Sequence, residues 1–388
     1  MLRCPRGFLS SGLVVLAAAC VAWPLQAKEP FRYPEGRHGK GELRYVNQVP
    51  VLFVAGTPEE IGEQVAELGL KPGRRLLHYP RDVLKEFGAA MSWKLFVLAG
   101  RRLERQIPDP YRRELDAMAR TGLDRETLLA ANTMFDVVKL IACSSLIVEP
   151  QRSATGGPLF GRNLDFPTAG YLQEYSLVLV CRPQGKYSFV SVGFPGLVGC
   201  LSGINEKGLA VAVHEVLQAG DGSKKFDPDG TPYAMNYRRI LEECSSVEEA
   251  EALLRSLKRT TRNNLVVCDR RGGAIFELTP SSVVVRKAQD GLCPCTNHFC
   301  SRELAPPQVE NRVYTCDRYR CLQENSSKYS RLGLPELRQL LHQVNGGDFT
   351  LQTMVFEPAD MRLHVALGSC PATVLPLRTL DVAALLGQ

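Results

Sequence analysis

The sequence lacks several features that would place it in a specialised class. Beyond its N-terminal segment it has no uninterrupted apolar run approaching the ~20 residues that a membrane-spanning helix needs. It has no internal repeat and no low-complexity tract. Its 47 basic and 41 acidic residues are spread along the chain rather than gathered in a run of one sign. Because no aromatic-and-basic recognition motif accompanies them, the sequence indicates no nucleic-acid partner.

Standard metal and protease signatures are also absent. Five cysteines lie around His298: Cys293, Cys295, Cys300, Cys316 and Cys321. A C-x-C pair followed by C-x4-C is not a usual structural-zinc spacing. The sequence therefore favours disulfides or buried thiols there over a metal site. The six histidines stand in no pattern that a papain-like cysteine protease would require. We therefore expect neither a metal nor a cofactor.

The composition is that of an ordinary globular protein with an export signal. With 388 residues, 45% hydrophobic and 23% charged, the chain can bury a large core. Arg3 and Arg6 precede an apolar stretch over residues 8–21, and a cut after Ala27 would make residues 1–27 a signal peptide. Residues 16–20 (LAAAC) offer a second interpretation, a lipoprotein site that would leave Cys20 lipidated. We expect a secreted or periplasmic protein, with a lipid anchor as the alternative.

The local patterns divide the chain near residue 143. Before it, helix signals dominate: residues 57–60 (Thr-Pro-Glu-Glu) form a capping box, and Asp109-Pro110 and Asp124 begin further helices. After it, strand patterns take over, and helices are predicted between them at 233–244, 246–257 and 335–344. The predicted strands are 144–149, 159–164, 175–181, 187–192, 209–214, 265–269, 274–278, 283–286, 354–356 and 362–366. Hairpin strands with helices between them favour an α+β fold in one large domain. We expect a helical segment over 28–142 packed on a catalytic region over 143–388.

Cys143 lies where this helical part meets the first predicted strand. Alone it would be interpreted as a small buried hydrophobic residue. The hairpin returns, however, as Gly-Arg-Asn-Leu-Asp-Phe over 161–166, which brings Arg162 and Asp165 next to the strand that Cys143 begins. Residues three apart in a strand point to opposite faces, so both can serve one site only at a strand end. Phe166-Pro167 supplies such an end.

Three further segments complete a family pattern: Ser-Gly-Ile-Asn-Glu-Lys-Gly-Leu over 202–209, Thr-Asn-His-Phe over 296–299, and Asp-Arg-Tyr over 317–319. With the stretch 54–62 (VAGTPEEIG) and Val-Phe-Glu-Pro at 355–358, the sequence resembles the N-terminal-nucleophile group of penicillin V acylase, bile salt hydrolase, acid ceramidase and isopenicillin N acyltransferase. The resemblance covers roughly residues 50 to 370. Any single segment is weak, whereas the set in the family's order, with R-x-x-D about twenty residues after the cysteine, is specific.

The resemblance implies a four-layer αββα fold and self-cleavage on the N-terminal side of Cys143, whose two fragments stay associated. Carried over residue by residue, it implies a catalytic set at six positions: Cys143, Arg162, Asp165, Asn205, Asn297 and Arg318. Many relatives follow the nucleophile with threonine, and Ser144 keeps the hydroxyl at that position. The implied substrates are small N-acyl amides or acyl thioesters.

The chemistry of these residue types agrees with that interpretation. A cysteine thiol attacks as the thiolate, at a pKa of about 8.5, and an α-amine of pKa about 7.7–8.0 on the same residue is a matched base, so no catalytic histidine is needed. Arg162 would favour the thiolate, and Asp165 would accept hydrogen bonds from the amine. The amides of Asn205 and Asn297 would donate to the oxyanion, while Arg318 would orient the site or bind a carboxylate.

Simpler interpretations remain open at this point. Arg162 and Asp165 can form an ordinary ion pair at a strand end, and Asn205 before Glu-Lys-Gly can be a turn residue. The competing functions are a papain-like cysteine protease and a non-catalytic binding protein on the same fold. The acyl and amine halves of the substrate, and the choice between hydrolysis and acyl transfer, do not follow from the sequence, because one fold serves several chemistries.

Overall fold

The computed structural model describes residues 31–86, 93–139 and 142–387. The predicted signal peptide over 1–27, with Cys20, lies outside the described residues. In the described ranges no helix is long and apolar enough to cross a membrane. The chain is built on two β-sheets, which confirms the α+β class predicted from the sequence.

The larger sheet has ten strands in the order β1-β2-β3-β6-β7-β8-β9-β10-β11-β12. All neighbouring strands are antiparallel except β3 and β6, which run parallel with Phe53 opposite Val180. The bounds of its strands are Gly36–His38, Gly41–Val46, Val49–Gly56, Leu177–Pro183, Phe189–Gly193, Ser202–Asn205, Ala210–Glu215, Asn263–Cys268, Gly273–Leu278 and Val283–Lys287. This sheet therefore joins the two sides of residue 143 through hydrogen bonds between β3 and β6.

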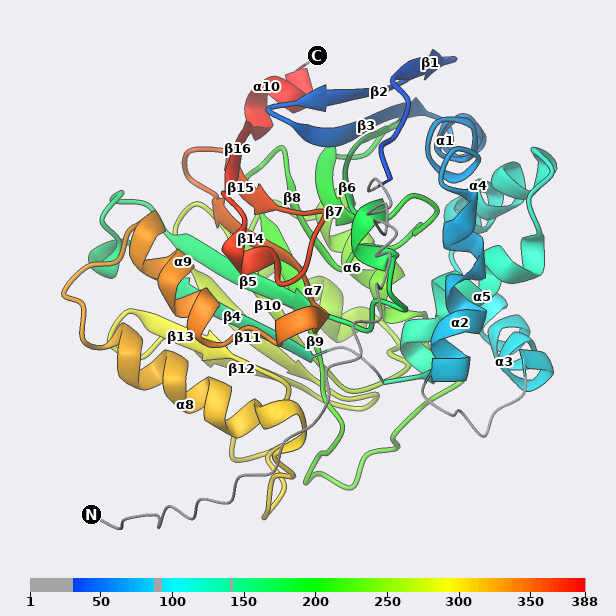
Figure 1. The fold of residues 1–388 in the computed structure, drawn as a ribbon. Helices are drawn as coiled ribbons and strands as arrows, with labels where there is room; N and C mark the ends of the chain where they lie inside the picture. The colour runs from blue at the N-terminus through cyan, green and yellow to red at the C-terminus, as the bar shows by residue number, and fades with distance from the viewer. Residues whose placement is uncertain (1–30, 87–92, 140–141, 388) are drawn as a thin grey trace, which may run out of the picture. The chain divides into compact units, whose positions relative to one another are not determined.

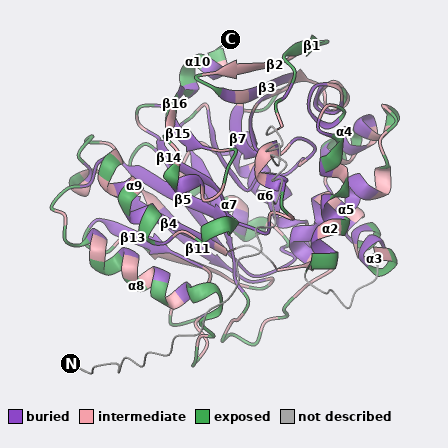
Figure 2. Cartoon of the chain, viewed as in Figure 1, coloured by how far each residue is buried: buried purple, intermediate pink, exposed green. Residues whose placement is uncertain are grey.

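The smaller sheet has six antiparallel strands in the order β13-β4-β5-β14-β15-β16. Their bounds are Leu292–Cys295, Ala142–Val148, Leu159–Asp165, Thr350–Glu357, Arg362–Ala366 and Arg378–Asp381. The β4–β5 hairpin lies in the interior of this sheet, between β13 and β14. Its residues are buried along almost their whole length, and β4 and β5 are accordingly purple in Figure 2.

An apolar layer joins the two sheets. Ile147 and Phe160 of the β4–β5 hairpin pack in it with Val178, Val190 and Val266 of the larger sheet. Because side chains alternate along a strand, Ile147 on the inner face places Ser145 and Cys143 on that face too. The nucleophile predicted from the sequence therefore faces the layer between the sheets.

α8 and α9 lie on the outer face of the smaller sheet, and α6 and α7 lie on the larger sheet (Figure 1). Val382 and Leu385 of α10 instead pack into the layer between the sheets. Leu337 and Leu340 of α9 and Leu322 of α8 pack with Leu146 and Val355 on the outer face of the smaller sheet. The remaining large core combines residues of the ten-stranded sheet with residues of α1 to α7, and it extends to Cys143 and Leu164 of the hairpin. The helix bounds are Pro58–Val65, Tyr79–Glu86, Trp93–Glu104, Asp109–Arg120, Arg125–Val137, Tyr233–Glu243, Val247–Ser256, Thr315–Ser326, Leu334–Gln343 and Val382–Gly387 for α1 to α10.

Several helix starts follow the predicted capping chemistry. The backbone N–H of Glu60 donates to Thr57 Oγ1 (3.3 Å), and the backbone N–H of Thr57 donates to Glu60 Oε2 (2.8 Å). At the start of α5 the backbone N–H of Thr127 donates to Asp124 Oδ2 (3.1 Å). Side-chain oxygens thus satisfy amide groups that a helix start leaves without partners.

The N-terminal segment differs from the sequence prediction in one respect. Residues 28–142 were expected to be helical, but they also supply strands β1, β2 and β3 to the ten-stranded sheet. β3 is bordered on one side by β6, more than 120 residues further along the chain. Pairing over that distance leaves no local pattern in the sequence. β2 and β3, however, form a local hairpin with Val46 opposite Val49, and the sequence prediction missed it.

Candidate active site

The β4–β5 hairpin sets the positions of Cys143, Arg162 and Asp165. In its register Cys143 lies opposite Leu164, Ser145 opposite Arg162, and Ala142 opposite Asp165. Cys143 and Arg162 are therefore diagonal neighbours on the inner face, within reach of a long side chain. The thiol of Cys143 is fully buried and faces the side chain of Arg162 and the backbone N–H of Asp165.

Burial dominates the acid–base state of the thiol of Cys143. It raises the pKa of Cys143 to about 11, while the charge of Arg162 and the N–H of Asp165 act in the opposite direction. At neutral pH the thiol is therefore protonated, and a base is needed before it can act as a nucleophile. None of the described histidines makes a hydrogen bond to Cys143, and burial lowers the pKa of His298 to about 4. That arrangement does not fit a papain-like Cys/His pair.

Arg162 is held firmly beneath the thiol. It is fully buried, and its Nη1 donates to the backbone carbonyl of Val213 (2.8 Å). Its Nε and Nη2 find no hydrogen-bond acceptor among the described residues. A buried guanidinium with unused donors has positive charge available for an anion on the same face. The thiolate of Cys143 is such an anion.

Asp165 ends the strand with its carboxylate on the other side of the hairpin. Its Oδ1 accepts a hydrogen bond from Thr350 Oγ1 (2.6 Å) in the neighbouring strand β14. Burial raises the pKa of this carboxyl group, and the charge of Arg318 is the first of the opposing effects. Arg162 and Asp165 were expected to serve one site only at a strand end, and this geometry agrees with that expectation. The backbone N–H of Asp165 faces the thiol, while its side chain faces Thr350 and Gly346.

Asn297 and Arg318 hold the backbone on either side of the Cys143 side chain. β13 pairs with β4 so that Cys295 lies opposite Ser145, and Asn297, two residues further, reaches Cys143. The backbone N–H of Cys143 donates to Asn297 Oδ1 (2.7 Å). Arg318, from the first turn of α8, donates through Nη2 to the same Oδ1 (2.9 Å) and through Nη1 to the carbonyl of Cys143 (2.5 Å).

Ser144 also belongs to this network. Its hydroxyl accepts a hydrogen bond from Arg318 Nη1 (2.7 Å). The hydroxyl group at this position therefore has a defined partner, which an alkyl side chain could not bind. The guanidinium of Arg318 is nine-tenths buried, and burial lowers its pKa while Asp165 and Cys143 raise it. Arg318 thus binds Cys143, Ser144 and Asn297 rather than facing solvent.

Asn205, which the sequence prediction placed in the oxyanion site, lies elsewhere. Its Nδ2 donates to the carbonyls of Leu241 (2.9 Å) and Cys244 (2.7 Å), and its Oδ1 accepts from the backbone N–H groups of Lys207 (3.1 Å) and Leu209 (2.9 Å). It closes the β8–β9 turn, at the opposite end of β9 from the Val213 carbonyl that binds Arg162. The structure therefore brings five of the six predicted residues together and assigns Asn205 to the turn.

Glu215 is a member of the site that the sequence prediction missed. It ends strand β9, and its backbone carbonyl accepts a hydrogen bond from Asn297 Nδ2 (2.9 Å). Its buried carboxylate accepts a hydrogen bond from the Tyr233 hydroxyl (3.0 Å). Its position in the sequence could have indicated it, because Glu215 directly follows the strand predicted over 209–214 and therefore lies at the end of that strand.

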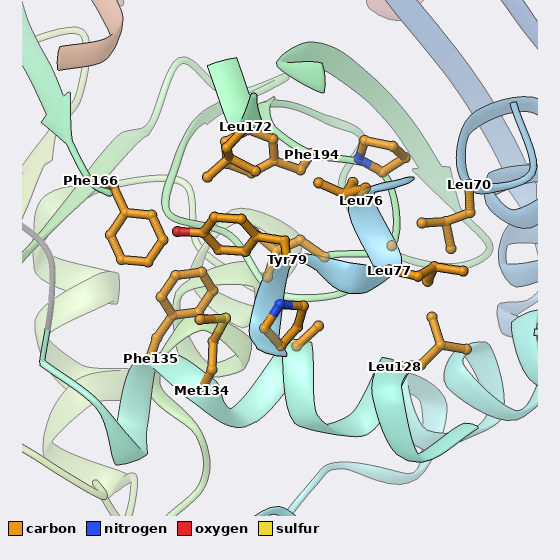
Figure 3. Close-up of a pocket in the computed structure, with 15 residues that line it drawn as sticks. Leu70, Leu76, Leu77, Tyr79, Leu128, Met134, Phe135, Phe166, Leu172 and Phe194 are labelled. Carbon is orange, nitrogen blue, oxygen red and sulfur yellow. The ribbon is translucent and has the colours of Figure 1, made fainter. Parts of the chain in front are cut away.

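An apolar pocket lies beside the hairpin end (Figure 3). Phe166, the residue after Asp165, forms part of its wall and packs against Phe135 of α5, with ring centroids 5.5 Å apart. The other lining side chains come mostly from the N-terminal helices and the loop after β7: Leu70, Leu76, Leu77, Tyr79, Pro80, Leu128, Ala131, Met134, Leu172, Phe194, Pro195 and Leu197. A pocket of this composition suits an aliphatic or aromatic group.

The cysteine cluster holds no metal-ligand arrangement among the described residues. Cys293 and Cys295 are buried, whereas Cys300, Cys316 and Cys321 are partly exposed, and all the described cysteines carry free thiols. The guanidinium of Arg286 lies next to Cys293, with Nη1 3.7 Å from its Sγ. The buried-thiol interpretation therefore fits Cys293 and Cys295.

Comparison with known proteins gives a family match over more than half of the chain. The family model for acyl-coenzyme A:6-aminopenicillanic acid acyl-transferase matches residues 152–370, a range that includes Arg162, Asp165, Asn297 and Arg318 and begins after Cys143. A curated but uncharacterised protein of Archaeoglobus fulgidus is 23% identical over an alignment of 272 residues that covers 61% of this chain. The match spans 44% of the length of that relative.

Solved structures with partial similarity include a bile acid hydrolase, an amidase and an acylase. A variant of conjugated bile acid hydrolase from Clostridium perfringens is 16% identical with a TM-score of 0.48, covering 63% of this chain and 95% of that one. An N-acylethanolamine-hydrolyzing acid amidase orthologue from Caenorhabditis elegans is 17% identical with a TM-score of 0.45, covering 56% and 93%. Penicillin V acylase from Agrobacterium tumefaciens is 14% identical with a TM-score of 0.44, covering 62% and 86%.

Proposed function

Because the chain belongs to the acyl-coenzyme A:6-aminopenicillanic acid acyl-transferase family, we propose that it is a cysteine amidohydrolase or acyltransferase that activates itself by cleavage between Ala142 and Cys143. One observation carries the proposal. The backbone N–H of Cys143 is bound by Asn297 Oδ1 and its carbonyl by Arg318, while its thiol faces Arg162. These contacts would hold an α-amine and a thiol in the positions that an N-terminal nucleophile needs. The fold proposed with it is the four-layer αββα form of that class.

Activation uses the thiol against its own peptide bond. The Cys143 sulfur adds to the carbonyl carbon of Ala142, the C–N bond breaks, and the amide nitrogen takes the proton to become the amine of Cys143. Water then hydrolyses the resulting thioester, releasing the Ala142 carboxyl group and restoring the thiol. Asn297 supports this step because its Oδ1 already accepts the hydrogen of the nitrogen that departs.

Turnover repeats the chemistry on a substrate. The freed amine, with a pKa near 7.7–8.0, takes the thiol proton, and the thiolate is stabilised by the charge of Arg162. The thiolate attacks the acyl carbon of an N-acyl amide, the side-chain amide of Asn297 donates to the oxyanion, and the amine leaves with the proton. Water completes hydrolysis of the thioester, whereas a second amine would complete acyl transfer.

The first prediction concerns the cut. Purified protein should consist of two associated fragments, one ending at Ala142 and one spanning 143–388. Intact-mass measurement under denaturing conditions reads both ends directly. A single uncut mature chain that still hydrolyses an acyl amide would refute self-cleavage, and a single uncut chain without activity would favour a binding protein on this fold.

Export belongs to the same proposal, because Arg3, Arg6 and the apolar stretch over 8–21 are typical of a signal peptide. The mass of the N-terminal fragment distinguishes its forms: a start after Ala27 indicates a secreted protein, and a lipid-modified Cys20 indicates an anchored one. Retention of Met1 in cytoplasmic fractions would rule out both.

The acyl half of the substrate is proposed to occupy the apolar pocket of Figure 3. Its wall residue Phe166 directly follows Asp165, so the pocket begins at the strand end whose backbone N–H faces the Cys143 thiol. Burying each methylene group of an acyl chain is worth about 0.8 kcal/mol, which favours chains long enough to fill the pocket. Aliphatic acyl groups that fill the pocket are therefore the proposed acyl donors.

The second prediction tests that pocket. Ala131 lines it from α5, and Ala131→Trp would fill it with an indole ring. The ratio of kcat/KM for decanoyl over butyryl amides of one amine should fall by about tenfold, since roughly two buried methylenes would be lost. Arg120→Trp, which adds the same ring at an exposed position at the end of α4, is the control and should keep the wild-type ratio. An unchanged chain-length ratio in Ala131→Trp would mean that the acyl group binds elsewhere.

A further inference from the structure

A groove with basic walls begins at the nucleophile on another side from the apolar pocket. It consists of two adjoining cavities of about 240 and 500 Å³, which share seven lining residues, among them Lys139, Leu217 and Arg312. Asn297, whose Oδ1 binds the Cys143 amide, lines the first cavity together with Glu215. The groove therefore leads away from the position at which a scissile amide would lie.

Cations outnumber carboxylates in this groove. Lys139 and Arg312 line both cavities, and Lys225 and Arg262 line the second. The carboxylates among the lining residues are Glu215, which accepts the Tyr233 hydroxyl, and Glu310, which pairs with Arg312 at 2.9 Å. After that pairing, Lys139, Lys225 and Arg262 remain as cations on the groove walls. Two buried carboxylates act on Lys139: Glu215, which lines the groove, and Asp136, which does not.

Two of these cations, Arg262 and Lys139, have buried N–H donors that are not used in hydrogen bonds to the described residues. Arg262 is 7% exposed and is fixed by hydrogen bonds from its Nη1 to the Leu217 carbonyl (3.4 Å) and from its Nη2 to the Ser223 carbonyl. Its Nε and the Nζ of Lys139 are buried and have no hydrogen-bond partner among the described residues. A buried charged donor without an acceptor is costly, so an anion that enters the groove would be bound with a net gain.

The two sides of the nucleophile thus differ in chemistry. One side is the apolar pocket walled by Phe135 and Phe166, and the other is the groove walled by Lys139 and Arg262. We propose that the groove binds a carboxylate on the amine half of the substrate, so that N-acyl amino acids are the preferred substrate class. This inference rests on the proposed amidase function and specifies its leaving group.

The test compares two substrates that differ in one group. N-decanoylglycine and N-decanoylglycinamide share the acyl chain and the scissile amide, and only the first carries a carboxylate. For the self-processed enzyme, kcat/KM should be about tenfold or more higher for the glycine conjugate, since hydrogen bonds to charged groups are among the stronger ones. The advantage should shrink as ionic strength rises, because salt screens the partly open groove.

Variants locate the effect in the groove. Arg262→Gln should bring the glycine-to-glycinamide ratio close to one, and Lys225→Gln, at an exposed position that tolerates substitution, should lower it two- to threefold. Arg271→Gln is the matched control: Arg271 is 72% exposed, pairs with Glu248 and does not line the groove, so the wild-type ratio should persist.

The outcomes separate this inference from the proposed function. Hydrolysis of both substrates at equal rates would overturn the inference but remain consistent with the proposed amidase function. That result is also expected if the groove binds an anionic acyl donor instead. A wild-type preference that survives both Arg262→Gln and Lys225→Gln also overturns it, because the carboxylate would then be bound elsewhere. Failure to hydrolyse either substrate, in protein shown by mass to be cut, contradicts the proposed function and the inference together.

Discussion

Replacing Cys143 with alanine should leave the chain uncut and without amidase activity, because the proposed mechanism uses one sulfur atom for both the self-cleavage and the turnover. The variant should fold, since loss of a single buried sulfur is small beside a typical stability of about 5–15 kcal/mol. Intact-mass measurement and amine release from an acyl amide check the two effects separately. Complete cleavage in Cys143→Ala, or wild-type turnover by it, would show that another residue is the nucleophile.

Cys143→Ser refines the same prediction. A hydroxyl is a far weaker nucleophile than a thiolate at neutral pH, so processing should slow greatly and turnover should fall further. The serine hydroxyl would lie against Arg162, whose unused donors can satisfy its oxygen. Near-normal processing with poor turnover would mean that the peptide geometry, rather than thiol chemistry, limits the cut.

Replacing Asn297 with alanine should have the second-largest effect. The variant loses the acceptor for the Cys143 N–H, one partner of Arg318 and the donor proposed for the oxyanion. Loss of an oxyanion donor alone lowers kcat by about 10²–10³-fold in other enzymes, so we expect a fall at least that large together with slow processing. Single-turnover cleavage in refolded precursor, followed by mass, and steady-state amine release measure the two quantities.

Asn205→Ala is the matched comparison, because it removes the same side chain from a buried site outside the cluster. Four backbone groups would lose their partner, which costs about 1–3 kcal/mol for each that stays buried and unsatisfied. The variant should therefore melt several degrees lower while the folded protein keeps its kcat. If Asn205→Ala lost activity without losing stability, the turn assignment would be refuted and the sequence-based oxyanion role restored.

The sequence predicted the hairpin site better than the surrounding sheet. Cys143, Arg162 and Asp165 lie within 23 positions of one another, so strand alternation and a proline after Phe166 were enough to place them. Asn297 and Arg318 were reached only through the family resemblance, since the register of β13 against β4 that brings Asn297 to Cys143 is a long-range pairing. No local pattern encodes that pairing.

Asn205 and Glu215 show where motif reasoning failed: it selected Asn205 for the site and missed Glu215. Asn205 ends β8 and Glu215 ends β9. An asparagine before Glu-Lys-Gly is as suitable for a turn as for catalysis. The side that faces the nucleophile depends on which end of β9 approaches β4. In the structure that end carries Glu215, whose carbonyl binds Asn297, and Asn205 is left at the far end.

Strand β3 gives the proposed cut a thermodynamic consequence. It belongs to the segment before residue 142, yet it is hydrogen-bonded into the ten-stranded sheet beside β6, which follows the cut. Before cleavage the sheet forms within one chain, whereas afterwards the same sheet joins two molecules and its assembly becomes bimolecular. Loss of the N-terminal fragment would then expose the edge of β6. Because assembly is bimolecular after the cut, the midpoint of thermal unfolding of the mature enzyme would depend on protein concentration, whereas that of the precursor would not.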